Sequence, residues 1–256
     1  MFEYKKSLGQ NFLKDNNIIN KIVDSINTNK DDLIIEIGPG DGSLTKELVK
    51  KDSDVLCFEI DERLKKSLES IDSKHLNIIF DDFLRVNLKD YISDKYKRLF
   101  FVGNLPYYIT TAIINKITNE SNPYEITIMI QKEVANRFMA KPGSREYSSI
   151  SVYLQYNFDI TKVCDVSKNS FEPIPKVDSM VIKLKSKNKE YVKDEELFYK
   201  IVKDSFKQKR KNLRNNLRSY DLDKIENILT SINKTLQNRA EELSVNDFIY
   251  LSNEYK

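Results

Sequence analysis

Three glycines at alternate positions mark the first segment of the chain whose residue types could do chemistry. Gly38, Gly40 and Gly42 follow a short apolar run, and the acidic Glu36 precedes them. Glycine permits a sharp turn and a close approach of a ligand to the backbone, because no Cβ intervenes. The spacing matches neither the GxxxxGK[ST] phosphate loop nor the GxGxxG dinucleotide loop. Glu36 would repel a phosphate and suits a zwitterionic or cationic ligand. The alternative interpretation of a glycine run alone is a tight turn that binds nothing.

Acidic residues also follow the next two candidate strands. Glu59 ends the second strand, where an acid contacts ribose hydroxyls in nucleotide-binding sheets, and Asp82 follows the third. The carboxyl ends of parallel strands meet at one edge of a sheet. A crevice with acids after three strands therefore predicts a positively charged nucleoside, such as S-adenosylmethionine (AdoMet), as the ligand.

A second motif, Asn104-Leu105-Pro106-Tyr107, follows the fourth candidate strand. The exocyclic N6 of adenine is a weak nucleophile because its lone pair is conjugated with the ring. The Asn104 side-chain oxygen and a backbone carbonyl near Leu105 could accept its two hydrogens and aim the lone pair at a sulfonium methyl group. Tyr107 can stack on the base, a contact worth ~1–3 kcal/mol. The alternative interpretation is a proline turn with core aromatics.

Few side chains suit other chemistries. The 256 residues include one histidine, His75, and two cysteines, Cys57 and Cys164. They cannot form a zinc site of the usual kinds, nor a nucleophilic triad unless His75 is its base. Methyl transfer from a sulfonium depends on positioning more than on acid–base groups, so we expect a site without a metal. Both cysteines lie in apolar runs that are typical of buried thiols in a reducing cytosol.

These motifs need a sheet whose strands end together. Candidate strands are Leu33–Ile37, Val55–Ile60, Leu76–Phe80, Leu99–Val102 and Ile126–Ile130. Helical spacing between them covers Ser43–Lys51, Asp61–Ser70, Thr110–Thr118 and Gln131–Ala140. This alternation predicts a parallel sheet with right-handed crossovers, an α/β sandwich. Two later runs, Val152–Phe158 and Val177–Leu184, are predicted as extra strands at an antiparallel edge.

The pattern changes to helical spacing without strand signals from about Lys189. We therefore predict a large α/β domain at residues 1–185 and a small helical domain at 190–256, joined by a linker within Lys183–Lys193.

Charge is distributed unevenly along the chain. The net charge is +3, but the segment Lys183–Arg218 contains 13 basic and 5 acidic residues, net +8. This block is either a solvated helix face or a phosphate-binding surface. No uncharged run is apolar enough to span a membrane, and motifs start within ten residues of Met1. We therefore expect a cytoplasmic protein without a signal peptide or a membrane partner.

Together the motifs resemble the ribosomal RNA adenine N6-dimethyltransferases of the KsgA/RsmA type. The resemblance covers nearly the whole chain, and its motifs occur in order. Beyond the glycine loop, Glu59, Asp82 and Asn104–Tyr107, it rests on Lys5–Leu13, Gln131–Ala135, Phe171–Ser179, Gln208–Leu217 and Arg239–Ser244. Any one of these is moderately specific, whereas the ordered series is strong.

The resemblance implies a Rossmann-like, AdoMet-dependent methyltransferase sandwich with a small all-helical C-terminal domain that binds rRNA. It implies dimethylation of N6 of two adjacent adenosines near the 3′ end of small-subunit (16S) rRNA during late ribosome assembly. The small ribosomal subunit would be the partner of a chain that we expect to be a monomer.

Functional residues carry over where this sequence matches the family motifs. The residues that would bind AdoMet are Asn11, Leu13, Gly38, Gly40, Glu59, Asp82 and Asn104. The residues that would hold the adenine are Asn104, Leu105 and Tyr107, with Phe171 as a second wall of the base pocket. The residues that would meet rRNA phosphates are Lys209, Arg210, Lys211 and Arg214.

Some positions depart from the family pattern. Tyr108 stands where family members often have Asn, which bears on the second methylation, and Lys209 replaces one arginine of the usual Gln-Arg-Arg-Lys. Erm-type methyltransferases of large-subunit rRNA share the glycine loop and the Asn-Leu-Pro-Tyr-like motif, but Gln208–Leu217 favours the KsgA type. DNA adenine methyltransferases typically have a second proline where Leu105 stands. A role as an assembly checkpoint that binds immature subunits is compatible with the enzymatic one.

Overall fold

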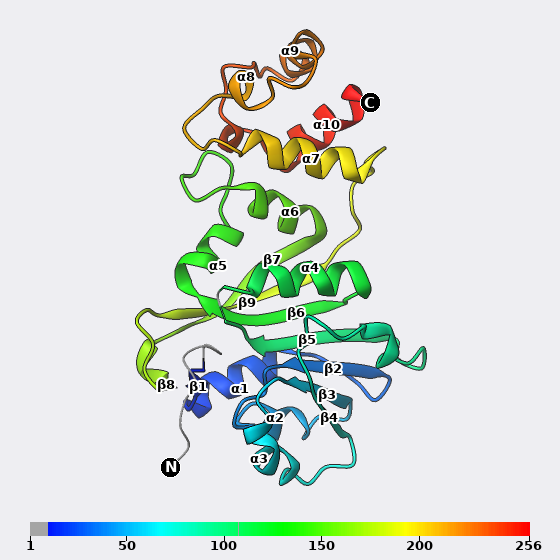
Figure 1. Cartoon of the computed structure of the whole chain (residues 1–256), viewed down its shortest axis with the longest axis vertical. Coiled ribbons are helices and arrows are strands. Elements are labelled where there is room, and N and C mark those ends of the chain that lie inside the picture. Colours follow the sequence, from blue (N-terminus) through cyan, green and yellow to red (C-terminus); the bar gives the residue numbers. More distant parts are fainter. Residues whose placement is uncertain (1–9, 107) are drawn as a thin grey trace. The chain divides into compact units, whose positions relative to one another are not determined.

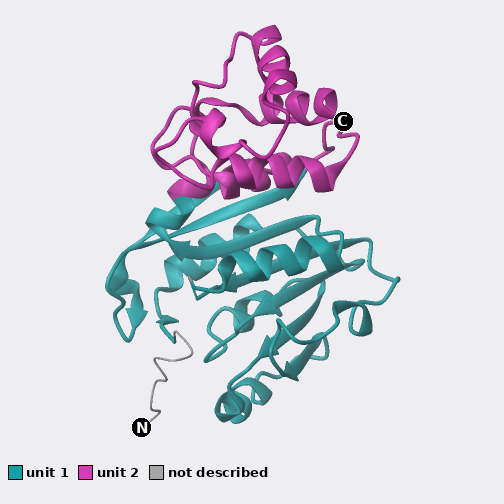
Figure 2. Ribbon diagram, turned by 45° about the horizontal axis from the view of Figure 1, so that its top comes forward, with its two compact units in different colours: residues 1–135, 161–186 teal, residues 136–160, 187–256 magenta. Residues whose placement is uncertain are grey.

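The computed structural model describes residues 10–106 and 108–256. Contacts divide the chain into two compact units, shown in Figure 2. Unit 1 contains residues 1–135 and 161–186, and unit 2 contains residues 136–160 and 187–256.

A seven-stranded sheet runs through unit 1 in the order β4-β3-β2-β5-β6-β9-β7 (Figure 1). Its strands are β2 (Asp32–Ile37), β3 (Asp54–Glu59), β4 (Leu76–Phe80), β5 (Arg98–Asn104), β6 (Glu125–Gln131), β7 (Phe158–Val166) and β9 (Ser179–Ser186). Strands β2 to β6 pair in parallel, and β9 pairs antiparallel with β6. The five parallel strands and the antiparallel strand at 179–186 were both expected from the apolar runs.

The central strands are continuous apolar runs because both of their faces are covered. Ile34 and Ile35, neighbours on opposite faces of β2, are both fully buried. The helices of this part of the chain are α1 (Asn16–Ser25), α2 (Thr45–Leu48), α3 (Lys65–Glu69), α4 (Thr110–Glu120) and α5 (Lys132–Phe138). Short 3₁₀ helices lie at Glu62–Leu64, Leu88–Asp90 and Lys168–Ser170.

A second, two-stranded sheet joins the start of the described chain to a late segment. Strand β1 (Phe12–Leu13) pairs antiparallel with β8 (Phe171–Glu172), so that Leu13 lies opposite Phe171. Both side chains are buried in the apolar cluster that also contains Ile18 and Val181. This pairing fixes residues 12 and 13 against the later segment of unit 1.

Unit 2 is mainly helical. It contains α6 (Ser149–Asn157), α7 (Glu195–Ser205), α8 (Leu213–Asn216), α9 (Leu222–Ser231), α10 (Val245–Tyr255) and a 3₁₀ helix at Ala240–Glu242. Its apolar core includes Tyr147, Val152, Phe198, Leu213 and Phe248. Within residues 10–106 and 108–256, no helix is long and apolar enough to cross a membrane.

The prediction of a strand at Val152–Phe158 is wrong, because most of this segment is helix α6. The helix is capped by Ser148, whose backbone N–H donates to Ser151 Oγ at 3.1 Å. Its buried residues lie on more than one face, so the apolar positions alternate as they would in a strand. A strand does follow, but it is β7, at Phe158–Val166.

The contacts also assign residues 136–160 to unit 2, whereas the sequence analysis placed them in the domain 1–185. The physical reason is that Tyr147, Val152 and Tyr156 pack into the core formed by the C-terminal helices. The later boundary, between residues 186 and 187, falls inside the linker that the sequence predicts.

Candidate functional site

The glycine loop connects β2 to α2 and depends on left-handed backbone conformations. Gly38, Gly40 and Gly42 have φ angles of +70°, +61° and +81°. A Cβ at Gly40 would lie 2.8 Å from ring carbons of Phe12, so a larger residue could not keep this arrangement. The loop is tied to the sheet by a hydrogen bond from the Gly38 N–H to the Phe58 carbonyl at 2.9 Å. Among the described residues, no heavy atom other than those of Gly38 and its chain neighbours lies within 4 Å of the place that a Cβ of Gly38 would occupy, so the backbone is uncovered there, whereas the Phe12 ring covers Gly40.

Glu59, at the end of β3, is buried and supports this loop. Its carboxylate accepts hydrogen bonds from the Gly40 N–H at 3.0 Å and from the Asp61 N–H at 2.8 Å. Burial raises the pKa of Glu59, and the two backbone N–H groups partly oppose that rise. The Glu59 carboxylate therefore connects the end of β3 to the loop that follows β2, at the carboxyl edge of the sheet.

Glu36 is a second buried carboxyl group under the same loop. Its side chain is 1% exposed. It accepts hydrogen bonds from Thr45 Oγ1 at 2.7 Å and from Cys57 Sγ at 3.5 Å. The pKa of Glu36 is raised to about 7, mainly by burial and to a smaller extent by the nearby Glu59 and Asp41, while the hydrogen bonds from Thr45 and Cys57 partly oppose the rise. Unlike most buried carboxylates, Glu36 forms no salt bridge with any described residue.

Residues 10–12 lie across the carboxyl ends of the strands. They contact residues at the ends of β3 and β5 and in the glycine loop. The Asn104 side chain, at the end of β5, donates from Nδ2 to the Asn11 carbonyl at 2.8 Å. Gln10 donates from Nε2 to Asp61 Oδ2 at 2.7 Å. With Phe12 against Gly40, this segment links the ends of β3 and β5 to the glycine loop.

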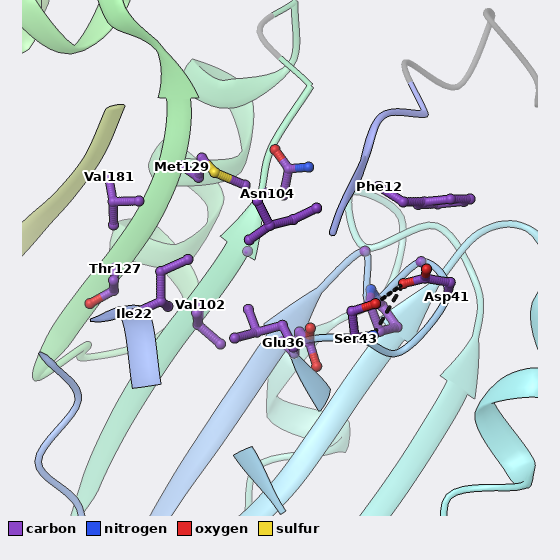
Figure 3. A pocket seen from close by; sticks show the side chains of 16 residues that line it. Phe12, Ile22, Glu36, Asp41, Ser43, Val102, Asn104, Thr127, Met129 and Val181 are labelled. Carbon is purple, nitrogen blue, oxygen red and sulfur yellow. Dashed lines mark hydrogen bonds between the residues drawn. The ribbon is translucent and has the colours of Figure 1, made fainter. Parts of the chain in front are cut away.

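These elements surround a pocket that is partly open to solvent, with about 480 Å³ of empty space when the open part is included (Figure 3). The residues that line it include four of the predicted site residues: Leu13, Gly38, Gly40 and Asn104. Further lining residues are Phe12, Ile22, Glu36, Pro39, Asp41, Ser43, Leu44, Val102, Gly103, Thr127, Met129 and Val181. The two sequence motifs, separated by more than sixty positions, thus meet in one cavity of unit 1.

Charge at the mouth of this pocket is balanced locally. Asp41 forms an ion pair with Lys14 and accepts hydrogen bonds from the Ser43 N–H and Oγ at 3.1 and 2.7 Å. Glu36 has no such counter-ion, so the pocket interior presents acid together with the apolar side chains of Val102 and Met129. This combination suits a ligand that is both positively charged and partly apolar.

Three other residues predicted to contact AdoMet or adenine, Asp82, Leu105 and Phe171, do not line this pocket. Asp82 accepts from the Leu84 N–H at 2.9 Å and pairs with Arg85 at 3.4 Å. Leu105 is buried, and its N–H donates to the Met129 carbonyl at 3.1 Å. Phe171 is 5% exposed and packs in the apolar core of unit 1.

Tyr107, predicted to stack on the base, lies outside the described residues. Its neighbour Tyr108 is 60% exposed. The roles of Asp82, Leu105, Tyr107 and Phe171 toward a substrate therefore stay predictions.

Phe12 is not among the residues that the sequence predicts for the site, whereas Glu36 is expected there as the acid that precedes the glycine loop. A signal for Phe12 was present in the motif Lys5–Leu13, which was recognised as a segment without assigning this ring a role. Glu36 was noted beside the glycines, but its burial comes from the packing of β2 against neighbouring strands.

The predicted rRNA contacts lie in unit 2 and face solvent. Lys209, Arg210 and Lys211 occupy the connection between α7 and α8, and Arg214 lies on α8. All four are exposed, and none forms a salt bridge with a residue that the structure describes. Solvated cations of this kind suit the neutralisation of phosphates.

Comparison with known proteins gives consistent results. The family model described as ribosomal RNA adenine dimethylase matches residues 1–256. A Bacillus mycoides protein named ribosomal RNA small subunit methyltransferase A is 41% identical over 266 residues, covering 98% of this chain and 91% of that protein.

Two solved structures share the fold. A dimethyladenosine transferase from Plasmodium falciparum has a TM-score of 0.76 at 26% identity, covering 93% of this chain and 95% of that one. The 23S rRNA methyltransferase ErmE has a TM-score of 0.74 at 25% identity, covering 95% of this chain and 99% of that one. These similarities confirm the predicted fold class, a Rossmann-like methyltransferase.

Proposed function

Because the chain belongs to the ribosomal RNA adenine dimethylase family, we propose that it transfers methyl groups from AdoMet to N6 of two adjacent adenosines near the 3′ end of small-subunit rRNA. The chain is an rRNA adenine dimethyltransferase, and its likeness to the small subunit methyltransferase A of Bacillus mycoides indicates the small subunit as the substrate. The late stage of assembly, a monomeric state and a cytoplasmic location are part of the same proposal.

A single observation carries this proposal. Gly38, at the predicted donor loop, and Asn104, at the predicted acceptor motif, line the same pocket at the carboxyl edge of one sheet. In-line transfer requires donor and acceptor to be held together, because orientation supplies much of the rate. Two motifs on separate edges of the sheet could not do this.

The pocket residues fit the methyl donor. When bound, AdoMet supplies an electrophilic methyl group on a positively charged sulfur. Glu36 offers a buried carboxyl group without a counter-ion, and Val102 and Met129 give apolar walls. Glu59, held by two backbone N–H groups, keeps lone pairs that can accept from ribose hydroxyls.

The acceptor side is organised by Asn104 and the residues after it. The hydrogen bond from Asn104 Nδ2 to Asn11 orients the amide, so its oxygen is the end available to accept from N6. The Leu105 N–H bond to Met129 fixes the backbone that carries the proposed second acceptor carbonyl. Pro106 restricts the chain at the same turn because its ring fixes φ. These residues position N6, and none of them needs to move a proton in the displacement step.

Incubation with labelled AdoMet tests the proposal directly. Purified chain is mixed with unmethylated small subunits or, in parallel, with large subunits, and the rRNA is digested to nucleosides. Labelled N6,N6-dimethyladenosine in the small-subunit arm is the expected result. Label confined to the large-subunit arm would instead support the Erm-type activity, and absence of label from both would contradict the proposal.

The exposed cations of unit 2 give a further prediction. Replacing Lys209, Arg210 and Lys211 together with alanine should weaken binding to small subunits. Each lost phosphate contact should flatten the dependence of log Kd on log salt by about one unit, because fewer counterions are released. Filter binding over a series of KCl concentrations measures the slope. An unchanged slope would indicate that this segment is a solvated helix face that does not bind phosphates.

A further inference from the structure

A second pocket is formed by residues of unit 2 alone. It has a volume of about 550 Å³ and is open to solvent. Residues from the end of α7, the connection 206–212 and the end of α8 surround it. No residue in the predicted site or in the predicted rRNA contacts lines it.

Two cations face this pocket, Lys207 and Arg218. Both are exposed, and neither forms a salt bridge with a described residue. Side-chain amides of Gln208 and Asn215 line the same pocket. An ammonium group, a guanidinium fork and amide N–H groups are the donors that bind a phosphate oxygen, and arginine can bind two oxygens at once.

The wall of the pocket is held in place by Asn216, which is 8% exposed. Its Nδ2 donates to the Ser205 carbonyl at 2.7 Å and to the Gln208 carbonyl at 3.3 Å. Its Oδ1 accepts from the Gln208 N–H at 3.0 Å. Carbonyl groups near the end of α7 are therefore already hydrogen bonded, which limits their competition for the two cations.

One acid, Asp204, also lines the pocket. Its Oδ2 accepts a hydrogen bond from the Tyr220 hydroxyl at 2.6 Å. This bond turns the carboxylate toward Tyr220 and satisfies part of its hydrogen-bonding capacity. With two cations against one anion, the formal charge of the lining residues is +1, which suits a singly charged phosphodiester better than a highly charged polyphosphate.

We propose that this pocket binds one backbone phosphate of the RNA substrate, with Lys207 and Arg218 as its charged contacts. The inference rests on the proposed function, since it assumes that RNA is the substrate. The neighbouring connection carries Lys209, Arg210 and Lys211, so adjacent phosphates of the same strand also meet positive charge. Their exposed side chains supply general attraction, whereas the pocket supplies one fixed point that sets the register of the RNA on unit 2.

The test compares two double variants of the full-length chain. In Lys207→Gln/Arg218→Gln the two charges are removed with polar side chains retained. The control, Lys66→Gln/Lys74→Gln, removes the same charge from two exposed lysines of unit 1. Affinity for unmethylated small subunits is measured over a KCl series. We expect the pocket variant to bind several-fold more weakly and to lose about one unit of salt slope, because one phosphate contact is lost, while the control keeps the wild-type slope.

A charge-preserving variant, Lys207→Arg/Arg218→Lys, should retain the wild-type slope. A slope equal to that of wild type, or a loss no greater than that of the control, would overturn the phosphate site. Failure of wild-type protein to methylate small subunits would instead refute the proposed function, so the two failures are distinguishable.

Discussion

Replacement of Asn104 by alanine is expected to reduce dimethyladenosine formation by roughly 10²–10³-fold, comparable to the loss of one preorganised hydrogen-bonding group at a reaction centre. The residue ends β5 and lines the pocket, and its Nδ2 contact with Asn11 orients the amide. Alanine removes the acceptor that would draw N6 toward tetrahedral geometry and aim its lone pair. Initial rates with labelled AdoMet and unmethylated subunits measure the effect.

Binding of small subunits should be largely retained in this variant, because the exposed cations lie in the other unit. Asn119→Ala, at an exposed position of α4, is the matched control and should keep wild-type rates. Methylation retained by Asn104→Ala would refute the role given to Asn104. If the variant still supports subunit assembly without methylating, the chain also acts as an assembly checkpoint.

Replacement of Glu36 by glutamine is expected to change how stability depends on pH. Burial raises the pKa of Glu36 from its ordinary value of 4.5 to about 7. Between these values the folded chain holds a proton that the unfolded chain releases, so the free energy of unfolding falls as pH rises. The contribution is fully present below pH 4.5 and is lost as pH rises through 7, with a total of about 3 kcal/mol.

Glutamine stays uncharged, so the wild type should lose about 3 kcal/mol relative to Glu36→Gln between pH 4.5 and pH 8. Urea unfolding at several pH values measures the difference between the two proteins. Glu69→Gln, which alters an exposed carboxyl group paired with Lys65, is the control for the replacement of a glutamate by glutamine. If the free energies of unfolding of Glu36→Gln and wild type changed in parallel with pH, the raised pKa of Glu36 would be contradicted.

The same ionisation bears on the donor pocket, which Glu36 lines. A ligand with net positive charge favours the ionised acid, and by linkage the ionised acid favours the ligand. Wild-type affinity for AdoMet should therefore increase between pH 6 and pH 8, whereas the affinity of Glu36→Gln should vary less. Calorimetric titration at each pH measures this.

Much of the fold followed from local patterns. The five apolar runs before residue 131 became parallel strands because each is long enough to span a sheet, and four of them carry buried residues on both faces, whereas β4, at the edge of the sheet, is only partly buried. The segment at 152–158 failed because its apolar residues alternate while helix α6 is buried on several sides. Periodicity reports burial on one face, and it loses its meaning where a short element is covered on more than one.

The part of the site that follows from the order and direction of the strands could be predicted from the sequence. Parallel strands end at a common edge, so the sequence alone predicts that the glycine loop and Asn104 lie together. Neither local pattern nor spacing gives the contacts that come from distant segments. The Phe12 ring against Gly40 and the Asn11 carbonyl on Asn104 depend on β1 pairing with β8, which joins positions about 160 residues apart.

The sequence by itself determined the residue types at the strand ends, the family and the helical character of the C-terminal segment. Only the tertiary structure decided how these residues behave. Burial beside other acids shifts the pKa of Glu36 upward, and Asn216 holds the turn that places Lys207 and Arg218 around one pocket. The physical reason is that local sequence specifies conformation over a few residues, whereas solvent exclusion and electrostatic neighbourhood are set by chain segments that meet only on folding.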